Sequence, residues 1–298
     1  MNKAVENQAT ITIGMPVFND VDFIEASLLS ILNQSFEDFK LIISDDGSSD
    51  GSADICKQYA AKDKRITYIR QPQNLGISKN MEFLLAQADT PYFMWAGDDD
   101  LYHKDFIKTH ISALSASPKA IVSFNKYELI DDDSLSYKVV DANYTSSSRF
   151  LQILKLIFIE NDGFGYGVFK TERMRKAKFP VWWWPNKRTP YNNIFPSLLY
   201  YLNRGLYLHQ EEVLFSKRVK QGNKINHVIG GQGNGIKELI FYCLRRFYLI
   251  NFGFVQLLKS KTWYNAFLAY PFLFIMWFVY SSVKMTFDSV RSKFKKSE

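Results

Sequence analysis

Three consecutive carboxylates, Asp98, Asp99 and Asp100, are the residues best suited to chemistry on a phosphorylated ligand. Adjacent carboxylates repel one another unless a cation offsets their charge. Carboxylate oxygens are ligands that Mg²⁺ or Mn²⁺ prefers. A divalent ion held there would contact a diphosphate and stabilise its negative charge as it leaves. The plain alternative is a solvated loop whose aspartates cap the next helix.

A second acidic turn, Asp45-Asp46-Gly47-Ser48, lies earlier in the chain. A carboxylate in such a turn can accept a hydrogen bond from the NH of a nucleotide base or from a ribose hydroxyl, as acidic residues do in other nucleotide folds. An ordinary turn is the alternative. If both acidic clusters follow strands of the same sheet, they are less easily explained as two unrelated turns than as parts of one binding site.

The elements around these clusters alternate between strand and helix. Apolar runs predict strands over residues 10–18, 39–44, 66–70 and 91–96, and helical spacing predicts helices over residues 22–34, 51–61 and 77–88. This alternation predicts a mostly parallel sheet flanked by helices. Ligands bind beyond the carboxyl ends of the strands in such sheets. Asn19-Asp20, Asp45-Asp46 and Asp98 to Asp100 all fall at those ends.

The rest of the chain is less regular. We expect a helix over 102–116, a strand over 120–129, a polar loop over 131–148, a helix over 149–160, a strand over 164–170 and a helix over 192–204. The composition becomes aromatic and basic from about residue 236. We therefore place a domain boundary there, with residues 1–235 as one domain and 236–298 as a C-terminal region.

Four segments of the sequence carry a resemblance to a known family. It resembles inverting family 2 glycosyltransferases with the GT-A fold, of the kind that build bacterial surface polysaccharides. The resemblance is strong over residues 10–130 and weak to about 225. The matching segments are Thr12–Asn19 (strand, Pro, x, aromatic, Asn), Ile43–Asp50 ("DDGSxD"), Asn74–Asn80 ("NxGxxxARN", with Lys79 for arginine) and Ala96–Asp100 ("DxD").

The resemblance implies a role for each matching residue. It assigns a Mn²⁺ or Mg²⁺ ion to Asp98, Asp99 and Asp100. The family usually has Asp where Gly97 stands, so which two carboxylates form the "DxD" pair stays open. The residues implied to bind the nucleotide sugar are Pro16, Phe18, Asn19, Asp45, Asp46, Lys79, Asp98 and Arg218.

Arg218 belongs to a late basic stretch, Phe215 to Lys220, which looks like the family's "YRxH" segment with Lys220 in place of the histidine. The resemblance implies that Arg218 or Lys220 contacts the donor phosphates. A solvated basic stretch is the alternative.

Inverting transfer needs a carboxylate that deprotonates the acceptor hydroxyl. The family often places this Asp in an "ED" pair, but the corresponding segment here reads Asn192-Asn193, and amides are not general bases. We take Asp162 as the candidate base, ahead of Glu160 and Glu172. Loss of catalysis is the remaining option.

Several other residues have both a functional and a structural interpretation. His209 and His227 are either metal ligands or structural histidines. The run Trp182 to Trp184 favours domain packing over sugar stacking. Lys187 and Arg188 would suit an acceptor diphosphate, but a solvated basic turn is favoured.

The C-terminal region has the composition of a membrane-associating segment. No residue from Thr262 to Val283 is charged, a length close to the roughly 20 residues that span a bilayer. From Val283 to Phe294, apolar residues at helical spacing with basic residues between them predict a basic amphipathic helix. A single span would put the basic tail outside, against the positive-inside rule. We therefore expect in-plane or re-entrant helices on the cytoplasmic membrane face, with a true span or a soluble helical bundle as alternatives.

Composition narrows the function further. The 298 residues carry a formal charge of +7, with 47% hydrophobic residues and 16% aromatic residues. The basic residues concentrate beside the aromatic tail, without a nucleic-acid motif, so a nucleic-acid partner is not expected. Two cysteines form no metal cluster, and residues 1–10 lack the apolar run of a secretory signal.

The combined expectation is a cytoplasmic, membrane-attached inverting glycosyltransferase. It would move a sugar from a nucleotide donor, with a UDP-sugar preferred, to a glycan or a polyprenyl-diphosphate-linked acceptor. A non-catalytic donor-binding scaffold and a sugar nucleotidyltransferase are the alternatives. The glycine- and Arg/Lys-rich phosphate loop of the nucleotidyltransferases is absent from the sequence.

Overall fold

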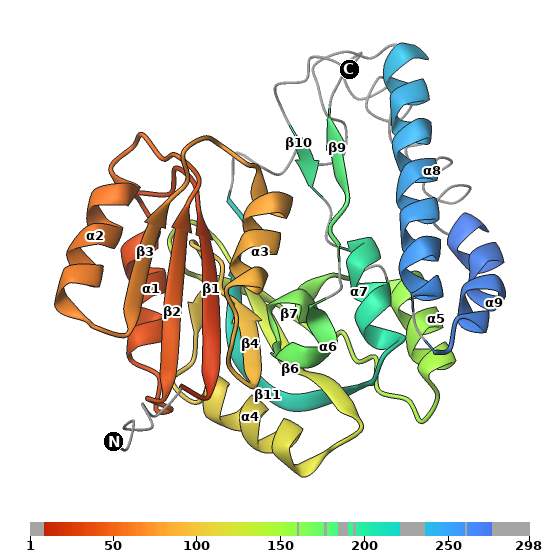
Figure 1. Ribbon diagram of the computed structural model, residues 1–298, viewed down its shortest axis with the longest axis horizontal. Coiled ribbons are helices and arrows are strands. Elements are labelled where there is room, and N and C mark those ends of the chain that lie inside the picture. Colours follow the sequence, from red (N-terminus) through yellow and green to blue (C-terminus); the bar gives the residue numbers. More distant parts are fainter. Residues whose placement is uncertain are drawn as a thin grey trace, which may run out of the picture.

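The computed structural model describes residues 9–159, 161–175, 178–183, 190–192, 195–220, 236–259 and 261–275. Over these residues the chain forms one nine-stranded mixed sheet with helices packed on its faces, and a two-stranded hairpin beside it (Figure 1). The strand order in the large sheet is β3-β2-β1-β4-β8-β6-β11-β5, with β7 paired to β6. This confirms the expected α/β fold class.

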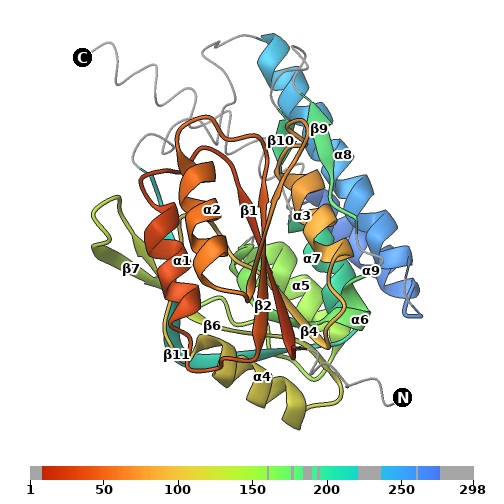
Figure 2. The ribbon, with the colours of Figure 1, turned by 60° about the vertical axis from the view of Figure 1, so that its left-hand side comes forward.

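The N-terminal half is the parallel part of the sheet. All seven residues of β1 are buried, because helices cover both of its faces. Helices α1 and α2 lie on one side of these strands and α3 on the other (Figure 2). The strands are β1 (Ile11–Val17), β2 (Phe39–Asp45), β3 (Ile66–Arg70) and β4 (Tyr92–Trp95), and the helices are α1 (Ile24–Leu32), α2 (Ser52–Lys62) and α3 (Ile77–Ala86).

Gly14 in β1 explains how closely α3 approaches the sheet. A Cβ atom at this position would lie 3.0 Å from the Cβ of Leu84 in α3 and 3.1 Å from the ring of Phe93 in β4. Only glycine leaves room for both neighbours without a shift. The close contact fixes α3, whose first residues carry the Ile77-Ser78-Lys79 segment.

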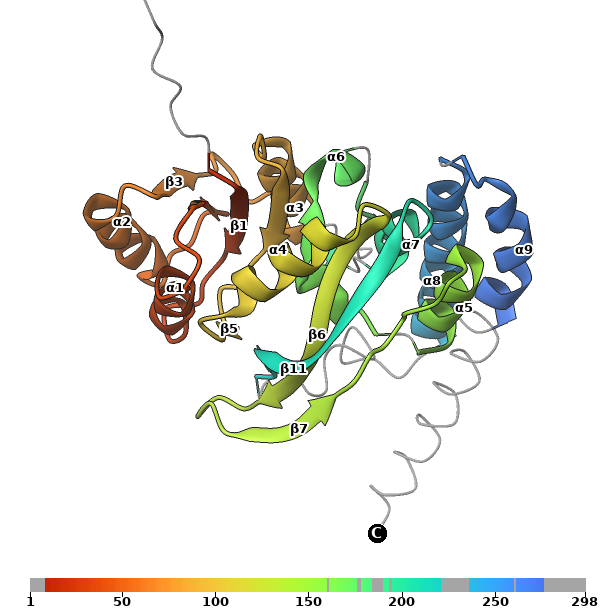
Figure 3. The same ribbon diagram turned by 90° about the horizontal axis from the view of Figure 1, so that it is seen from below.

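The second half of the sheet is mixed. Strand β6 pairs in parallel with β11 and antiparallel with β7 and β8, and β11 ends antiparallel to β5 (Figure 3). Helix α4 packs against β6. The bounds are β5 (Leu101–Tyr102), α4 (Phe106–Ala116), β6 (Ala120–Ile130), β7 (Ser136–Val140), the 3-10 helix η1 (Gly163–Tyr166), β8 (Val168–Lys170) and β11 (Leu206–Arg218).

The C-terminal helices form a separate layer that packs on α5 and α7. Asn203, at the end of α7, donates to Leu257 O at 2.8 Å and accepts from Thr262 Oγ1 at 2.7 Å and Asn265 Nδ2 at 2.9 Å. The elements are α5 (Arg149–Ile159), α6 (Thr171–Met174), β9 (Val181–Trp183), β10 (Pro190–Asn192), α7 (Phe195–Leu202), α8 (Ile236–Leu258) and α9 (Tyr264–Leu273).

Among the helices of the described ranges, none is both long enough and apolar enough to cross a bilayer. Large apolar side chains of this layer are nevertheless exposed. Residues exposed by a third or more of their surface include Leu151, Phe158 and Ile159 of α5, Leu244, Phe247, Val255 and Leu258 of α8, and Trp263, Tyr264, Phe267, Leu268, Phe272 and Ile275 in and beside α9.

The structure corrects the prediction in its second half. The expected polar loop over 131–148 contains β7. Four of the five residues of β7 are exposed, so the strand has no buried face that would give its sequence an apolar pattern. Strand β11 was not predicted, because the polar run Gln210 to Glu212 interrupts its apolar pattern. The register of β11 with β6 shifts at the same place. The expected strand over 164–170 is a 3-10 turn followed by the three residues of β8.

Candidate donor site

The loops that follow β1, β2 and β4 meet at one edge of the sheet. Phe18 donates its backbone N–H to Asp98 Oδ2 at 3.1 Å, which joins the β1 loop to the β4 loop. Asn19 donates its N–H to Ser48 Oγ at 3.0 Å, and its Oδ1 accepts the N–H of Ser49 at 2.8 Å. Asn19 has a φ of 54°, a conformation that asparagine adopts more easily than most residues. The three polar segments thus lie together, as their positions at strand ends indicated.

Pro16 and Phe18 differ in exposure. Pro16 lies within β1, level with Ser44 of β2, and is buried. The side chain of Phe18 is 49% exposed directly beyond the strand. An exposed aromatic ring beside the acidic loops is suited to stacking on a flat ligand.

Asp45 is held entirely by the protein. Its carboxylate is fully buried and accepts from Ser48 N–H at 2.8 Å, Tyr68 Oη at 2.6 Å and Arg70 at 2.8 Å. Burial alone would raise the pKa of Asp45, but the hydrogen bonds from Tyr68 and Ser48 and the charge of Arg70 outweigh it and lower the pKa. Asp45 is therefore ionised at neutral pH and shapes the turn that follows β2.

Asp46 fastens the turn before α3. Its two oxygens accept the N–H groups of Leu75 at 2.7 Å and Gly76 at 2.8 Å. Burial raises the pKa of Asp46 despite these hydrogen bonds. Gly76 has a φ of 75°, which favours glycine at this position. Lys79, one turn further on, pairs with Glu82 at 3.0 Å and exposes half of its side chain.

Asp20, Asp98 and Asp99 form a compact group, which we call the acid triad. One carboxylate oxygen of each lies within 4.8 Å of one from each of the others. The pKa of Asp98 lies well above its ordinary value, chiefly through desolvation and then through the charges of Asp20 and Asp99. Oxygen donors at this spacing fit a hard divalent cation, whose charge would relieve that repulsion.

Asp100 does not belong to the acid triad. Its Oδ1 accepts the N–H of Arg218 at 2.9 Å, and desolvation, with the charge of Asp99, raises its pKa to about 8. A Cβ atom on Gly97 would lie 2.4 Å from Asp100 Oδ2. The Asp100 carboxylate therefore fills the space of a side chain at position 97, where the family usually has Asp. The sequence grouped Asp100 with Asp98 and Asp99, whereas the structure groups Asp20 with them.

Arg218 connects two loops through the hydrogen bonds of its guanidinium group. Its guanidinium donates to Asp99 O at 3.0 Å, to the backbone carbonyls of Asp131 and Asp132, and to Ser134 Oγ at 2.9 Å. Arg218 was expected to contact donor phosphates. Four of its five N–H groups have protein acceptors in the structure, and the phosphate contact stays a prediction.

Asp162, the candidate base, lies beside the acidic loops. Lys217 lies 3.4 Å from Asp162 and rests on the ring of Tyr166. Desolvation would lower the pKa of Lys217, but the charges of Asp162, Tyr166 and Asp100 raise it well above its ordinary value. Lys217 thus stays charged beside Asp162. The Asp162 side chain is 43% exposed, which leaves it open to a ligand.

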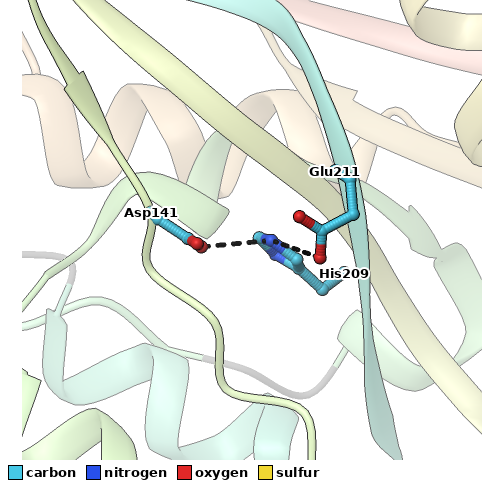
Figure 4. A group of neighbouring side chains, drawn as sticks. All are labelled: Asp141, His209 and Glu211. Atoms are coloured by element: carbon cyan, nitrogen blue, oxygen red, sulfur yellow. Dashed lines mark ion pairs between the residues drawn. The ribbon is translucent and has the colours of Figure 1, made fainter.

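His209 lies in a second acidic group, with Asp141 and Glu211 (Figure 4). His209 Nε2 is 3.1 Å from Asp141 and 3.9 Å from Glu211. The ammonium group of Lys126 contacts Glu211 and lies 3.6 Å from Asp141, so a protein cation already balances part of this charge. Both interpretations of His209, as a metal ligand and as a structural histidine, therefore stay open.

The remaining candidates are less informative. Glu172 is exposed and pairs with Arg173 at 2.9 Å. Asn192 lies in β10, whose backbone pairs with β9. The predictions that fall outside the described residues concern Glu160, Trp184, Lys187, Arg188, Asn193, His227 and the basic amphipathic helix from Val283 to Phe294, while Trp182 and Trp183 are described by their backbone in β9 alone.

Sequence reasoning missed two members of the site. Asp20 was noted as a polar residue at a strand end, which was the available signal, but not as part of an acidic group. Lys220 was considered, with Arg218, only as a contact of the donor phosphates; its ammonium lies against Asp20 and Asp99 of the acid triad. Residues 20 and 220 are 200 positions apart, and no local pattern links them.

The family model described as "Glycosyl transferase family 2" matches residues 12–196. Among curated proteins, the chain is 23% identical over 228 residues to "Glycosyltransferase GlyA" of Streptococcus pneumoniae, covering 72% of this chain and 31% of GlyA. It is 31% identical over 123 residues to "Putative teichuronic acid biosynthesis glycosyltransferase TuaG" of Bacillus subtilis, covering 41% of this chain and 48% of TuaG. The chain thus matches about a third to a half of the length of these relatives.

Solved structures share the fold. S. aureus TarS 1-349 in complex with UDP-GlcNAc superposes with a TM-score of 0.67 at 14% identity, covering 89% of this chain and 72% of that one. Mannosyltransferase PcManGT of Pyrobaculum calidifontis, in complex with GDP-Man and Mn²⁺, gives a TM-score of 0.52 at 13% identity, covering 96% and 76%. At these identities the likeness establishes the fold alone.

Proposed function

The chain belongs to glycosyl transferase family 2, and on that premise we propose that it is an inverting enzyme that uses a UDP-sugar donor in surface polysaccharide synthesis. The glycan assignment is supported by the similarity to TuaG, whose name places it in teichuronic acid biosynthesis, and the nucleotide by the similarity to the TarS complex with UDP-GlcNAc. The observation that carries the proposal is the acid triad at the edge where the β1 and β4 loops meet.

The donor would bind across the loops that follow β1, β2 and β4. Asp20, Asp98 and Asp99 would hold a Mn²⁺ or Mg²⁺ ion, which when bound neutralises the diphosphate leaving group. The exposed ring of Phe18 would stack on the nucleotide base. Asp45 and Asp46 position the surrounding turns through their backbone hydrogen bonds, and Lys79 reaches solvent from the first turn of α3.

Asp162 would act as the general base. An inverting transfer requires one carboxylate that removes the proton of the acceptor hydroxyl as the hydroxyl attacks the anomeric carbon. Asp162 is partly exposed, and Lys217 links it to the acidic loops through its ion pair. Lys217 would orient the carboxylate through this ion pair before the acceptor arrives.

Membrane attachment would be provided by the C-terminal region, residues 236–298, appended to a catalytic domain of residues 1–235. The exposed apolar side chains of α5, α8 and α9 form a surface suited to the interfacial layer of a cytoplasmic membrane face. Trp263 and Tyr264, both exposed by more than half, are residue types that favour that layer. A lipid-linked acceptor, such as a polyprenyl diphosphate glycan, would be presented there.

The donor assignment is tested by hydrolysis of UDP-, GDP- and dTDP-sugars with the full chain, in Mn²⁺, Mg²⁺ or EDTA. We expect release of one nucleotide that depends on the metal and is lost in Asp99→Asn. The matched control is Asp54→Asn, because Asp54 is exposed on α2 and pairs only with Lys57 among the ion pairs described. Release that persists equally in Asp99→Asn would refute the donor site.

The base assignment needs a separate measurement. Asp162→Asn should keep nucleotide affinity and lower transfer by about 10²- to 10⁴-fold. Glu172→Gln is the control, since Glu172 pairs with its neighbour Arg173 at the surface. Wild-type transfer by Asp162→Asn would assign the base elsewhere.

Membrane attachment is tested by flotation of the full chain with liposomes of anionic lipids. The double variant Leu268→Glu, Ile275→Glu places two charges on the exposed surface, where each native side chain is more than half exposed. We expect the wild type to float and the variant to stay in the soluble fraction. Equal flotation of both would contradict attachment through this surface.

A further inference from the structure

Lys220 places its ammonium group directly on the acid triad. Lys220 Nζ lies 2.8 Å from Asp20 Oδ1 and 2.7 Å from Asp20 Oδ2, and 3.1 Å from Asp99 Oδ2. The side chain of Asp20 is 6% exposed and that of Lys220 is 30% exposed, so neither group is freely solvated. The ring of Phe23 lies 5.3 Å below the ammonium. The ion pair between Lys220 and Asp20 is therefore largely buried, unlike a contact between two exposed side chains.

The contacts of Lys220 overlap those of a divalent ion. An ion held by the acid triad would need an oxygen from each carboxylate, and both oxygens of Asp20 already accept from Lys220. Two cations in contact with the same oxygens repel each other. A metal ion coordinated by the triad and a Lys220 ammonium in contact with Asp20 therefore exclude each other.

Charge balance explains why a lysine is stable here. The three carboxylates bring three negative charges when ionised, and among the described residues Lys220 is the only cation within ion-pair distance of any of them. Arg218 is close in sequence but directs its guanidinium to backbone carbonyls and a serine. Lys220 thus supplies the positive charge that the loops need in the absence of a metal.

We propose that Lys220 is a built-in counter-cation of the donor site, which competes with a divalent ion for Asp20 and Asp99 and releases them when that ion binds. The inference rests on the proposed donor site and adds a regulatory residue to it. Lys220 makes the affinity of the site for a divalent ion lower than it would be for the three carboxylates without a lysine. Lys220 also keeps the loops folded between turnovers.

The test is direct measurement of Mn²⁺ affinity, by electron paramagnetic resonance of free Mn²⁺, on the full chain without nucleotide. Lys220→Met should bind Mn²⁺ about tenfold or more tightly than the wild type, because a competing unit charge in contact is removed. Lys40→Met is the matched control. Lys40 pairs with Asp89 near the start of β2, at the opposite end of the strand from Asp45, and its loss should leave Mn²⁺ affinity unchanged.

A thermal shift separates a folding defect from the proposed role. In EDTA, Lys220→Met should melt below the wild type, and saturating Mn²⁺ should raise its Tm by more than it raises that of the wild type. Lys220→Gln keeps a polar side chain without the charge and should behave like Lys220→Met. Equal Mn²⁺ affinity in the wild type and both variants, or no Mn²⁺ binding by any of them, would overturn the inference.

Binding of UDP distinguishes this inference from the proposed function. If UDP binds with Mn²⁺ but Lys220→Met shows wild-type Mn²⁺ affinity, the counter-cation role is wrong and the donor site stands. If Lys220→Met binds Mn²⁺ more tightly but no nucleoside diphosphate binds to either protein, the counter-cation role holds and the donor proposal is wrong.

Discussion

Replacing Arg218 tests whether its guanidinium supports the protein or binds the donor. It makes four hydrogen bonds, to the carbonyls of Asp99, Asp131 and Asp132 and to the hydroxyl of Ser134. Hydrogen bonds that involve a charged group contribute about 1.5–3 kcal/mol each and are not additive. Since Arg218 is 5% exposed, we expect Arg218→Met to lower the free energy of unfolding by about 3–5 kcal/mol.

Arg218→Lys is the informative companion. It keeps the charge but replaces a planar fork by a single nitrogen, which does not span three carbonyl groups. We expect an intermediate loss of about 1–3 kcal/mol. Urea unfolding followed by circular dichroism gives both values. Nucleotide affinity, measured where each variant remains folded, should change by less than about tenfold, which corresponds to 1.4 kcal/mol.

The opposite pattern would refute the reasoning. If Arg218→Met unfolds at the same urea concentration as the wild type and yet loses nucleotide binding, the guanidinium acts on the ligand. The hydrogen bonds between the β4 loop and the turn after β6 would then contribute little to stability. The contact with donor phosphates that the family resemblance implies would be supported.

Three further predictions concern stability. His110 is fully buried and desolvation lowers its pKa to about 4; because the unfolded chain binds that proton below about pH 6.5, stability should be full above this pH and fall by about 3 kcal/mol as the pH drops to 4. Urea unfolding at pH 7 and pH 4.5 measures the fall, and His110→Gln should lack it. Asn203→Leu should loosen α8 and α9, seen as faster cleavage of residues 236–275 in limited proteolysis, and unchanged protection would contradict the role of its three hydrogen bonds. Gly14→Ala should cost about 1–3 kcal/mol by pressing on Leu84, whereas a neutral effect in thermal unfolding would mean that α3 can shift.

The N-terminal half of the fold was predictable because local pattern and tertiary packing agree there. Strands β1 and β2 are apolar runs buried on both faces, so their sequence shows their environment directly. The polar residues that follow them mark the strand ends, and parallel pairing then brings those ends to one edge. The position of the candidate donor site was predicted from this pattern together with the family resemblance of the same segments.

The second half was not predictable for the opposite reason. Strand β7 is mostly exposed and, among the described strands, pairs only with β6, and β11 carries a polar run at which its register with β6 shifts. Both are strands because of partners that precede them in the chain. The contact of Lys220 with the acid triad was hidden in the same way, because Lys220 follows β11 and lies 200 positions after Asp20 in the chain.

Gly97 and Asp100 have a consequence for how this site can change through mutation. The Asp100 carboxylate lies where a Cβ on residue 97 would stand, and its hydrogen bond to Arg218 N–H holds it there. An aspartate introduced at position 97 alone would displace Asp100 from that hydrogen bond. We therefore expect the two positions to be coupled: an aspartate at 97 should be better tolerated when residue 100 is smaller, so the effect of either substitution depends on whether the other is present.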